Sequence, residues 1–343
     1  MQKARIICRI AMHHARQGEV AQAQECFNEV RTAFGGRFNP EVAAILFVAE
    51  GVLAFFQGDE SRALDRMRRG YGIANSMNAV HAKALCAAWM AHLAFNENRY
   101  PEMVRLLRES LNSSAKDDHA ARARLSLVLA DAFHFSGRFD RAAPWYTAAR
   151  LHATAEGDEA TLSALLHNIA AFRASNLRLA GAVLADGEAS RHALLEAKSA
   201  FNFDSAVGTL SFGGLLPLLQ AQVMSMRGDF VEALQMLHRI DVNSLPPRLQ
   251  AQCWAELAYC EVSTDLPEAA LQHAGLAADG ITTTRDADDR AYVHSRLALV
   301  FAKLLDESAS KEHSALAIYE TGRHRGEQAA LLEQLVAEFP EAE

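Results

Sequence analysis

The side chains best suited to chemistry in this 343-residue chain are scattered and match no known catalytic motif. His92, Asp131 and His134 would form an acid/base or metal cluster if folding brought them within a few ångströms of one another. The fourteen histidines otherwise lack the short i, i+4 spacing of metal sites. An enzyme-associated domain with a cluster at these three residues is therefore the alternative hypothesis. The simpler interpretation is that these side chains are merely solvated.

Motifs that position phosphate, cofactor or nucleophile are absent from the sequence. It contains no GxxxxGK[ST], no GxGxxG and no HExxH. Ser211 stands one residue out of register with the GxSxG pattern of a nucleophile elbow. The aspartates around Asp288 lack the glycine and the distal glutamate of a calcium loop, which favours helix capping. We expect neither an enzyme nor a cofactor.

Composition and charge narrow the classes of partner. The net charge of −8 argues against direct binding to nucleic acid or to an acidic membrane surface. The five cysteines form no CxxC pair and sit within apolar patterns, which is typical of reduced thiols in a cytoplasmic protein. No apolar run approaches the roughly 20 residues that span a bilayer. The N-terminal residues do not resemble a secretory signal.

The elements that would position these side chains are indicated by a recurring turn. Residues 224–240 read as the end of one helix, a turn at Gly228, and a second helix with Phe230, Ala233 and Leu237 at helical spacing. The equivalent turn positions are Gly18, Gly58, Asn98, Gly137, roughly Leu177, and Asp265, which by subtraction recur about every 40 residues. Glycine and asparagine tolerate the left-handed backbone that follows a helix end. A slim residue follows five positions later and a bulky one four positions after that. The pattern predicts an all-α solenoid of antiparallel helical hairpins, with about seven to eight repeats plus C-terminal capping helices.

The chain resembles the tetratricopeptide repeat (TPR) superfamily from about residue 4 to about residue 280. The residues that carry the resemblance are Gly51…Gly58…Ala63-x3-Met67, Ala130…Gly137-Arg-Phe139…Ala142-x3-Tyr146, and Gly228-Asp-Phe230…Ala233-x3-Leu237. The period is near 40 residues instead of 34, as in the sensor domain of the maltose-regulon activator and in peptide-responsive bacterial regulators. The family tryptophan is in register only at Trp254, and most copies lack the closing proline.

We expect one TPR-like solenoid over residues 1–343. Residues 1–200 would hold repeats 1–5 and residues 217–280 repeats 6–7. Residues 281–343 would form the last hairpin and capping helices, with separate helical runs at 314–321 and 327–338. Residues 201–216 are expected to be an irregular insert, either a loop packed on the next hairpin or a functional segment that bends the solenoid or closes over a ligand. The chain begins within a helical pattern that has little capping, so we expect a preceding segment.

The TPR resemblance implies that the first helix of each hairpin lines a concave groove. The positions that it assigns to this groove are Val52, Phe55, Trp89, His92, Asn96, Arg124, Asp131, His134, His167, Ala171, Gln222, Gln252 and Tyr259. Such a mixture of aromatic and polar side chains is typical of a recognition surface. The alternative is that Trp89 belongs to the core and that the polar groups are solvated lining.

The function expected from these observations is a non-enzymatic interaction or sensor module. Its concave face would bind a protein or peptide partner, or a small-molecule effector. The module would supply the signal input of a bacterial regulatory protein in the cytoplasm. The lysine/asparagine set with which some TPR proteins clamp a C-terminal carboxylate is absent, which argues against chaperone-tail binding.

Overall fold

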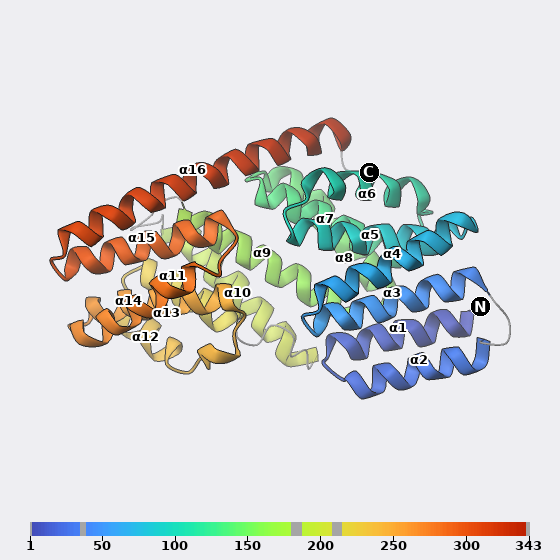
Figure 1. Ribbon diagram of the computed structural model, residues 1–343, viewed down its shortest axis with the longest axis horizontal. Helices are drawn as coiled ribbons and strands as arrows, with labels where there is room; N and C mark the ends of the chain where they lie inside the picture. Colours follow the sequence, from blue (N-terminus) through green and yellow to red (C-terminus); the bar gives the residue numbers. More distant parts are fainter. Residues whose placement is uncertain (1, 35–38, 180–186, 208–214, 341–343) are drawn as a thin grey trace. The chain divides into compact units, whose positions relative to one another are not determined.

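The protein is all-α in the computed structural model, which describes residues 2–34, 39–179, 187–207 and 215–340 (Figure 1). These residues form sixteen α-helices and one 3₁₀ turn, without a strand. Consecutive helices pair as antiparallel hairpins, so the predicted all-α helical-repeat architecture is confirmed. No helix in these ranges is both long and apolar enough to cross a lipid bilayer.

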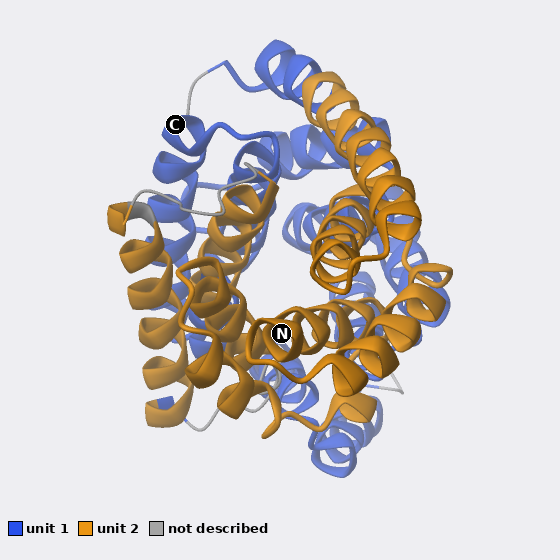
Figure 2. Ribbon diagram, turned by 90° about the vertical axis from the view of Figure 1, so that its left-hand side faces the viewer, with its two compact units in different colours: residues 1–165, 207–211, 331–343 blue, residues 166–206, 212–330 orange. Residues whose placement is uncertain are grey.

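The chain divides into two compact units, coloured separately in Figure 2. Unit 1 comprises residues 1–165, 207–211 and 331–343, and unit 2 comprises residues 166–206 and 212–330. The helices of unit 1 are α1 (Gln2–Arg16), α2 (Val20–Phe34), α3 (Pro40–Phe56), α4 (Glu60–Ser76), α5 (Val80–Asn96), α6 (Tyr100–Ser113), α7 (His119–Phe135) and α8 (Phe139–Glu156). Those of unit 2 are α10 (Gly187–Val207), α11 (Leu215–Met226), α12 (Phe230–Leu237), η1 (Val242–Ser244), α13 (Pro247–Ser263), α14 (Pro267–Ile281) and α15 (Ala287–Lys303). Helices α9 (Glu159–Leu179) and α16 (Glu307–Glu338) contribute residues to both units.

The predicted hairpin turns lie where the recurring glycines stand. Gly18, Gly58, Gly137 and Gly228 all have positive φ, between 74° and 86°, and each separates the two helices of a hairpin. At Gly58 the left-handed residue lets Asp59 N–H reach back to the Ala54 carbonyl, which terminates α3. A side chain at this φ would strain the backbone, so the recurrence of glycine has a steric cause.

One predicted turn is wrong. Leu177 lies inside α9, which continues to Leu179. The residues around Leu177 include no glycine or proline to stop the helix, and Arg173 on α9 pairs with Glu196 on α10 at 2.6 Å. The slim residue assigned to this repeat, Ala182, lies outside the described residues.

Slim and bulky residues pack as the pattern requires. Ala63 and Ala142 are completely buried between the helices of their hairpins, as are the bulky Met67 and Leu107. A Cβ on Gly51 of α3 would lie 2.9 Å from Cγ of Met67 on α4, so only glycine permits this close approach.

The first helices of successive hairpins lie against one another and form an inner layer in each unit. In unit 1, α1 packs on α3, α3 on α5 and α5 on α7; in unit 2, α11 packs on α13 and α13 on α15. This layer carries the residues that were assigned to a groove.

Two further expectations require correction. Residues 201–207 form the end of α10, so they are helical instead of part of an irregular insert; residues 208–214 lie outside the described residues. The two separate runs expected at 314–321 and 327–338 belong to the single 32-residue helix α16. Arg323 explains the continuity, because it pairs with Glu320 and with Glu327 along the helix and so bridges the segment that holds Gly322 and Gly326.

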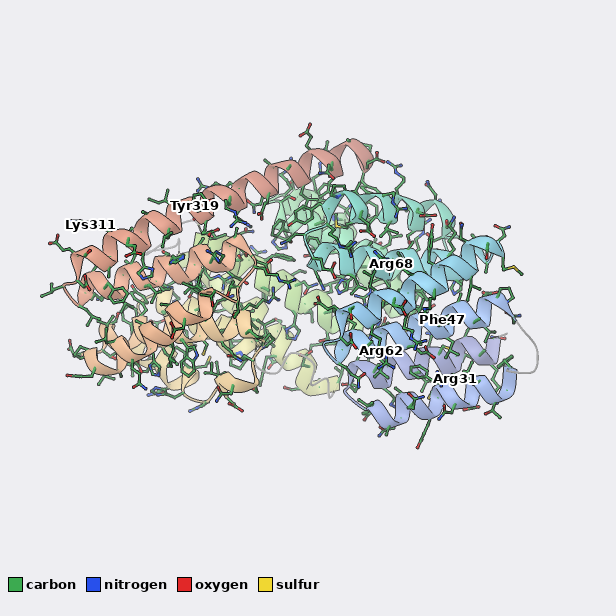
Figure 3. All side chains as sticks on the ribbon, in the orientation of Figure 1. Arg31, Phe47, Arg62, Arg68, Lys311 and Tyr319 are labelled. Carbon is green, nitrogen blue, oxygen red and sulfur yellow. The ribbon has the colours of Figure 1, made fainter. Side chains whose placement is uncertain are left out.

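The end of α16 covers apolar side chains of unit 1. Leu331, Leu335 and Phe339 are buried, and the Phe339 ring lies 6.5 Å, centroid to centroid, from that of Trp145 on α8. Earlier in α16, Tyr319 remains exposed (Figure 3). The earlier part of α16 packs on α15 through its other face, where Glu320 is buried and pairs with Arg290.

Candidate functional site

A cavity of about 340 Å³ lies within unit 1, and we call it the Arg124 cavity. Its walls come from three first helices, α1, α5 and α7, and from the turn that begins α9. The lining residues are Ile6, Arg9, Ile10, Met12, His13, Arg16, Leu85, Trp89, Ala120, Arg124, Glu156, Gly157, Asp158 and Thr161. The volume falls within the range of small-molecule sites, roughly 300–1,000 Å³.

Trp89 and Arg124 form the inner wall of this cavity. The guanidinium carbon of Arg124 lies 3.9 Å above the centre of the Trp89 ring, within the distance of a cation–π contact. Arg16 approaches the same ring at 5.6 Å. Phe55 and His92 pack edge-on against Trp89, with centroid distances of 6.5 and 5.8 Å. Trp89 is thus both buried in the core and part of the cavity wall.

Two ion pairs connect α1 with the turn before α9. Arg16 pairs with Asp158, and Arg9 pairs with Glu156 at 2.5 Å. Asp158 also caps α9 by accepting a hydrogen bond from the Thr161 backbone N–H. Burial raises the pKa of Asp158, but the charge of Arg16 and the hydrogen bonds from Thr161 outweigh it and bring that pKa to about 2. Both carboxylates of the cavity are therefore already paired with an arginine.

Arg124 is held less closely, although the charges of Asp158 and Asp131 favour its cationic form. Among the described residues, its hydrogen bond runs from Nη2 to Thr161 Oγ1 at 3.4 Å, and its Nε is buried without an acceptor. Burial and the nearby charge of Arg16 lower the pKa of Arg124 to about 9, so the group is still a cation at neutral pH. The same burial, with the charges of Arg124 and Arg16, lowers the pKa of His92 to about 3 and keeps that imidazole neutral.

The structure divides the alternative cluster of His92, Asp131 and His134 between two places. Tyr146 OH donates a hydrogen bond to Asp131 at 3.0 Å, so the contact with His134 Nδ1, at 3.2 Å, requires that nitrogen to be the donor. His92 instead lies with Phe55 and Trp89. The described residues contain no group of three possible metal ligands, so a metal cluster at these three positions is wrong.

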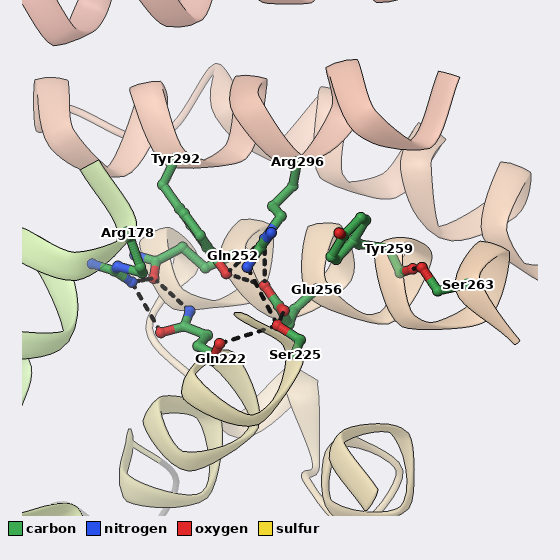
Figure 4. A network of polar contacts seen from close by, with 9 residues as sticks. All are labelled: Arg178, Gln222, Ser225, Gln252, Glu256, Tyr259, Ser263, Tyr292 and Arg296. Atoms are coloured by element: carbon green, nitrogen blue, oxygen red, sulfur yellow. Dashed lines mark hydrogen bonds and ion pairs between the residues drawn. The ribbon is translucent and has the colours of Figure 1, made fainter. Parts of the chain in front are cut away.

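The groove residues expected in unit 2 belong to a buried polar network (Figure 4). Arg178 of α9 donates to the amide oxygens of Gln222 and Gln252, at 3.0 and 2.7 Å. Gln252 in turn donates to Asp289 at 2.8 Å. Burial and the neighbouring Asp288 raise the pKa of Asp289 to about 7.

The other half of this network surrounds Glu256, which is completely buried. Arg296 Nε lies 3.1 Å from the Glu256 carboxylate, which also accepts hydrogen bonds from Ser225 and Tyr292. The ring of Tyr259 lies 4.4 Å from the guanidinium carbon of Arg296. Burial alone would lower the pKa of Arg296, but the Glu256 charge raises it above its ordinary value. Tyr259 and Gln222 therefore serve the interior of unit 2.

The remaining groove candidates lie in three different settings. His167 is buried on α9, with Nε2 2.6 Å from the Asp204 carboxylate on α10, and burial still lowers its pKa. Asn96 is exposed at the end of α5, and Val52 is buried in α3. Ala171 is half-buried. The structure brings only Trp89 and Arg124, of all these candidates, to the lining of the Arg124 cavity.

Sequence reasoning missed the partners of these residues. Arg16, Asp158 and Thr161 complete the Arg124 cavity, and Glu256 and Arg296 complete the network of unit 2. Asp158, three residues before Thr161 at the start of an apolar helical run, is an N-cap signal that could have been found. Arg16 lies 108 positions before Arg124 by subtraction. Nothing in the sequence spacing indicates that both arginines would approach the Trp89 ring.

Comparisons with known proteins identify the fold without a family. No family model matches the chain, and no curated protein matches it either. Among solved structures, the crystal structure of the apo form of RapI is similar, with a TM-score of 0.53 at 12% identity over 94% of this chain and 86% of that one. A circular tandem repeat protein of novel repeat topology also matches at 12% identity, over 98% of this chain and 97% of that one, but its TM-score is 0.23. The likeness to RapI supports a helical-repeat fold.

Proposed function

We propose that the protein is a non-enzymatic, TPR-type sensor module that receives a ligand in the Arg124 cavity. The observation that carries this proposal is a preformed space between first helices, walled by an aromatic ring and a buried cation. Such concave sites with a few placed polar groups are where helical scaffolds bind small ligands or the ends of peptides. The ligand would be a peptide, a partner segment or a small-molecule effector, and the protein would supply the input of a bacterial regulatory system in the cytoplasm.

The likeness to RapI adds support from the fold. That structure is described as the apo form of RapI. At 12% identity the likeness does not carry ligand identity, so the TPR resemblance and the cavity itself support the choice of a binding role.

A binding role also fits the chemistry of the cavity better than catalysis does. Its two carboxylates form ion pairs, and one of them also caps a helix, so their roles are structural. His92 stays neutral beside Trp89, away from the paired carboxylates. None of these groups forms the nucleophile–base pair that covalent catalysis requires.

The experiment that tests this role is affinity selection from a mixed pool of peptides and metabolites, read by mass spectrometry. The matched variant is Ala120→Leu, which fills the cavity from the start of α7 without removing a charge. We expect wild-type protein to retain at least one component that the variant releases. Retention of the same components by both proteins, or of none by either, contradicts the proposal. Circular dichroism must first show equal helicity of the two proteins.

A further inference from the structure

The charges of the Arg124 cavity do not balance. Arg9, Arg16 and Arg124 bring three positive charges to the lining, whereas Glu156 and Asp158 bring two negative ones. Each carboxylate is already paired, Glu156 with Arg9 and Asp158 with Arg16. Arg124, which is only 6% exposed, is the arginine of this lining that forms no ion pair with these two carboxylates, and the charges of Asp158 and Asp131 compensate it only in part.

A buried cation that is only partly compensated is unfavourable in a folded protein, and a further negative group would stabilise it. The Trp89 ring offsets part of this penalty through its face, and Thr161 offers one long hydrogen bond. Arg124 lines the cavity, and a guanidinium pairs with a planar anion through its N–H edge. A ligand with a negative group would therefore complete what the protein leaves incomplete.

The rest of the lining limits the ligand to one negative charge and an apolar body. Ile6 and Ile10 of α1 are 47% and 44% exposed, and both line the cavity together with Leu85. Exposed isoleucines beside a cavity favour an apolar occupant. A phosphate dianion would meet the carboxylates of Glu156 and Asp158, which disfavour a second negative charge. A cationic ligand would add to the existing excess.

We propose that the Arg124 cavity binds a small organic acid, with its carboxylate on Arg124 and its apolar body against Ile6, Ile10 and Leu85. This inference rests on the proposed function and names the class of its ligand. The same carboxylate chemistry is shared by free acids and by the end of a peptide; the size of the cavity favours the free acid.

The test compares acids with neutral amides of the same shape. Phenylacetate and hexanoate are titrated against phenylacetamide and hexanamide by calorimetry, at concentrations up to the millimolar range. In parallel, Trp89 fluorescence is followed in a Trp145→Phe/Trp254→Phe background. We expect at least one acid to bind about tenfold or more tightly than its amide, since a charge-assisted hydrogen bond is involved. Added salt should weaken binding of the acid and leave binding of the amide unchanged.

Three variants assign the effect to Arg124. Arg124→Gln should remove the preference for the acid, Arg124→Lys should retain part of it, and Ala120→Leu should abolish binding of acid and amide alike. Arg105→Gln is the control, because Arg105 is an exposed arginine of α6 in the same unit. Equal helicity by circular dichroism is required of each variant.

Each other outcome overturns the inference. Equal binding of acids and amides, an unchanged preference in Arg124→Gln, or failure of both acids to bind would each do so. Amides that bind to the wild type as tightly as the acids do, but not to Ala120→Leu, would refute the acid while keeping the cavity as a ligand site. The same conclusion would follow if the affinity selection yielded a peptide that binds in the cavity while neither acid binds. If nothing binds in an Ala120-dependent way, the proposed function fails as well.

Discussion

Each unit buries an arginine against an aromatic ring, but the two arginines differ in their counter-ions. Arg124 in unit 1 lies over Trp89, and Arg296 in unit 2 lies over Tyr259; they are 6% and 7% exposed. Arg296 has Glu256 as a counter-ion at 3.1 Å, whereas Arg124 has the Thr161 hydroxyl at hydrogen-bond distance and is compensated in part by the charges of Asp158 and Asp131. The pKa of Arg296 is accordingly raised and that of Arg124 lowered.

This difference separates a buried charge that the protein itself compensates from one that is available to a ligand. In unit 2 the carboxylate, the phenol and the hydroxyl around Arg296 satisfy one another, so the network is closed. In unit 1 the corresponding carboxylates are assigned to Arg9 and Arg16, and the cation that remains faces a cavity. Burial of a charge therefore indicates a site only where its counter-ion is missing.

The largest expected difference is between Arg296→Met and Arg124→Met. Arg296→Met leaves the Glu256 carboxylate buried without its cation and should lower the free energy of unfolding by roughly 3–5 kcal/mol. Arg124→Met removes an unpaired charge and should change it by less than about 1 kcal/mol, in either direction. Urea unfolding followed by circular dichroism measures both, and hydrogen exchange of α7 and α15 assigns the effect to a unit. Equal losses in the two variants would refute the distinction between the arginines.

A second difference concerns pH. The pKa of Asp289 is raised to about 7, above the ordinary value near 3.9 of an unfolded chain. Between about pH 4 and pH 7 the folded protein keeps a proton that the unfolded chain loses, so the contribution of Asp289 to the free energy of unfolding decreases as pH rises.

We therefore expect Asp289→Asn to match the wild type near pH 4 and to exceed its stability above pH 7, by on the order of 2 kcal/mol. Urea unfolding at a series of pH values measures this, and exchange protection of α5 and α7 in unit 1 serves as the internal control. A wild-type pH slope that survives in Asp289→Asn would show that another group is responsible.

The smallest expected effect is the coupling between each arginine and its ring. A double-mutant cycle with Trp89→Leu and Arg124→Met should yield about 0.5–2 kcal/mol, because the carboxylates near this cation compensate it only in part. The cycle with Tyr259→Leu and Arg296→Met should yield less, since Glu256 already offsets the charge. Equal couplings would mean that both cations are equally compensated.

The hairpins were predictable because their causes are local. Gly18, Gly58, Gly137 and Gly228 mark turns through a backbone conformation that glycine adopts without strain. Leu177 failed as a turn because that position was assigned from spacing alone, without a residue that ends a helix. The C-terminal helix was divided wrongly because the side-chain pairs of Arg323 maintain it across two glycines.

The candidate site was predictable only in part. Trp89 and Arg124 were singled out by a repeat pattern, and they do meet. His92 was grouped with Asp131 because both belong to first helices, yet its neighbours are aromatic rings. Repeat position indicates which layer a residue occupies but not which side chain it contacts, since contacts between helices depend on packing details.

The sequence by itself determined that the chain forms antiparallel helical hairpins, because slim, bulky and left-handed residues act within one turn or one helix pair. Only the tertiary structure decided which buried charges have partners. Counter-ions such as Asp158 for Arg16 and Glu256 for Arg296 come from distant parts of the chain. Electrostatic energy depends on distance and burial in the folded state, and neither quantity is encoded in local spacing.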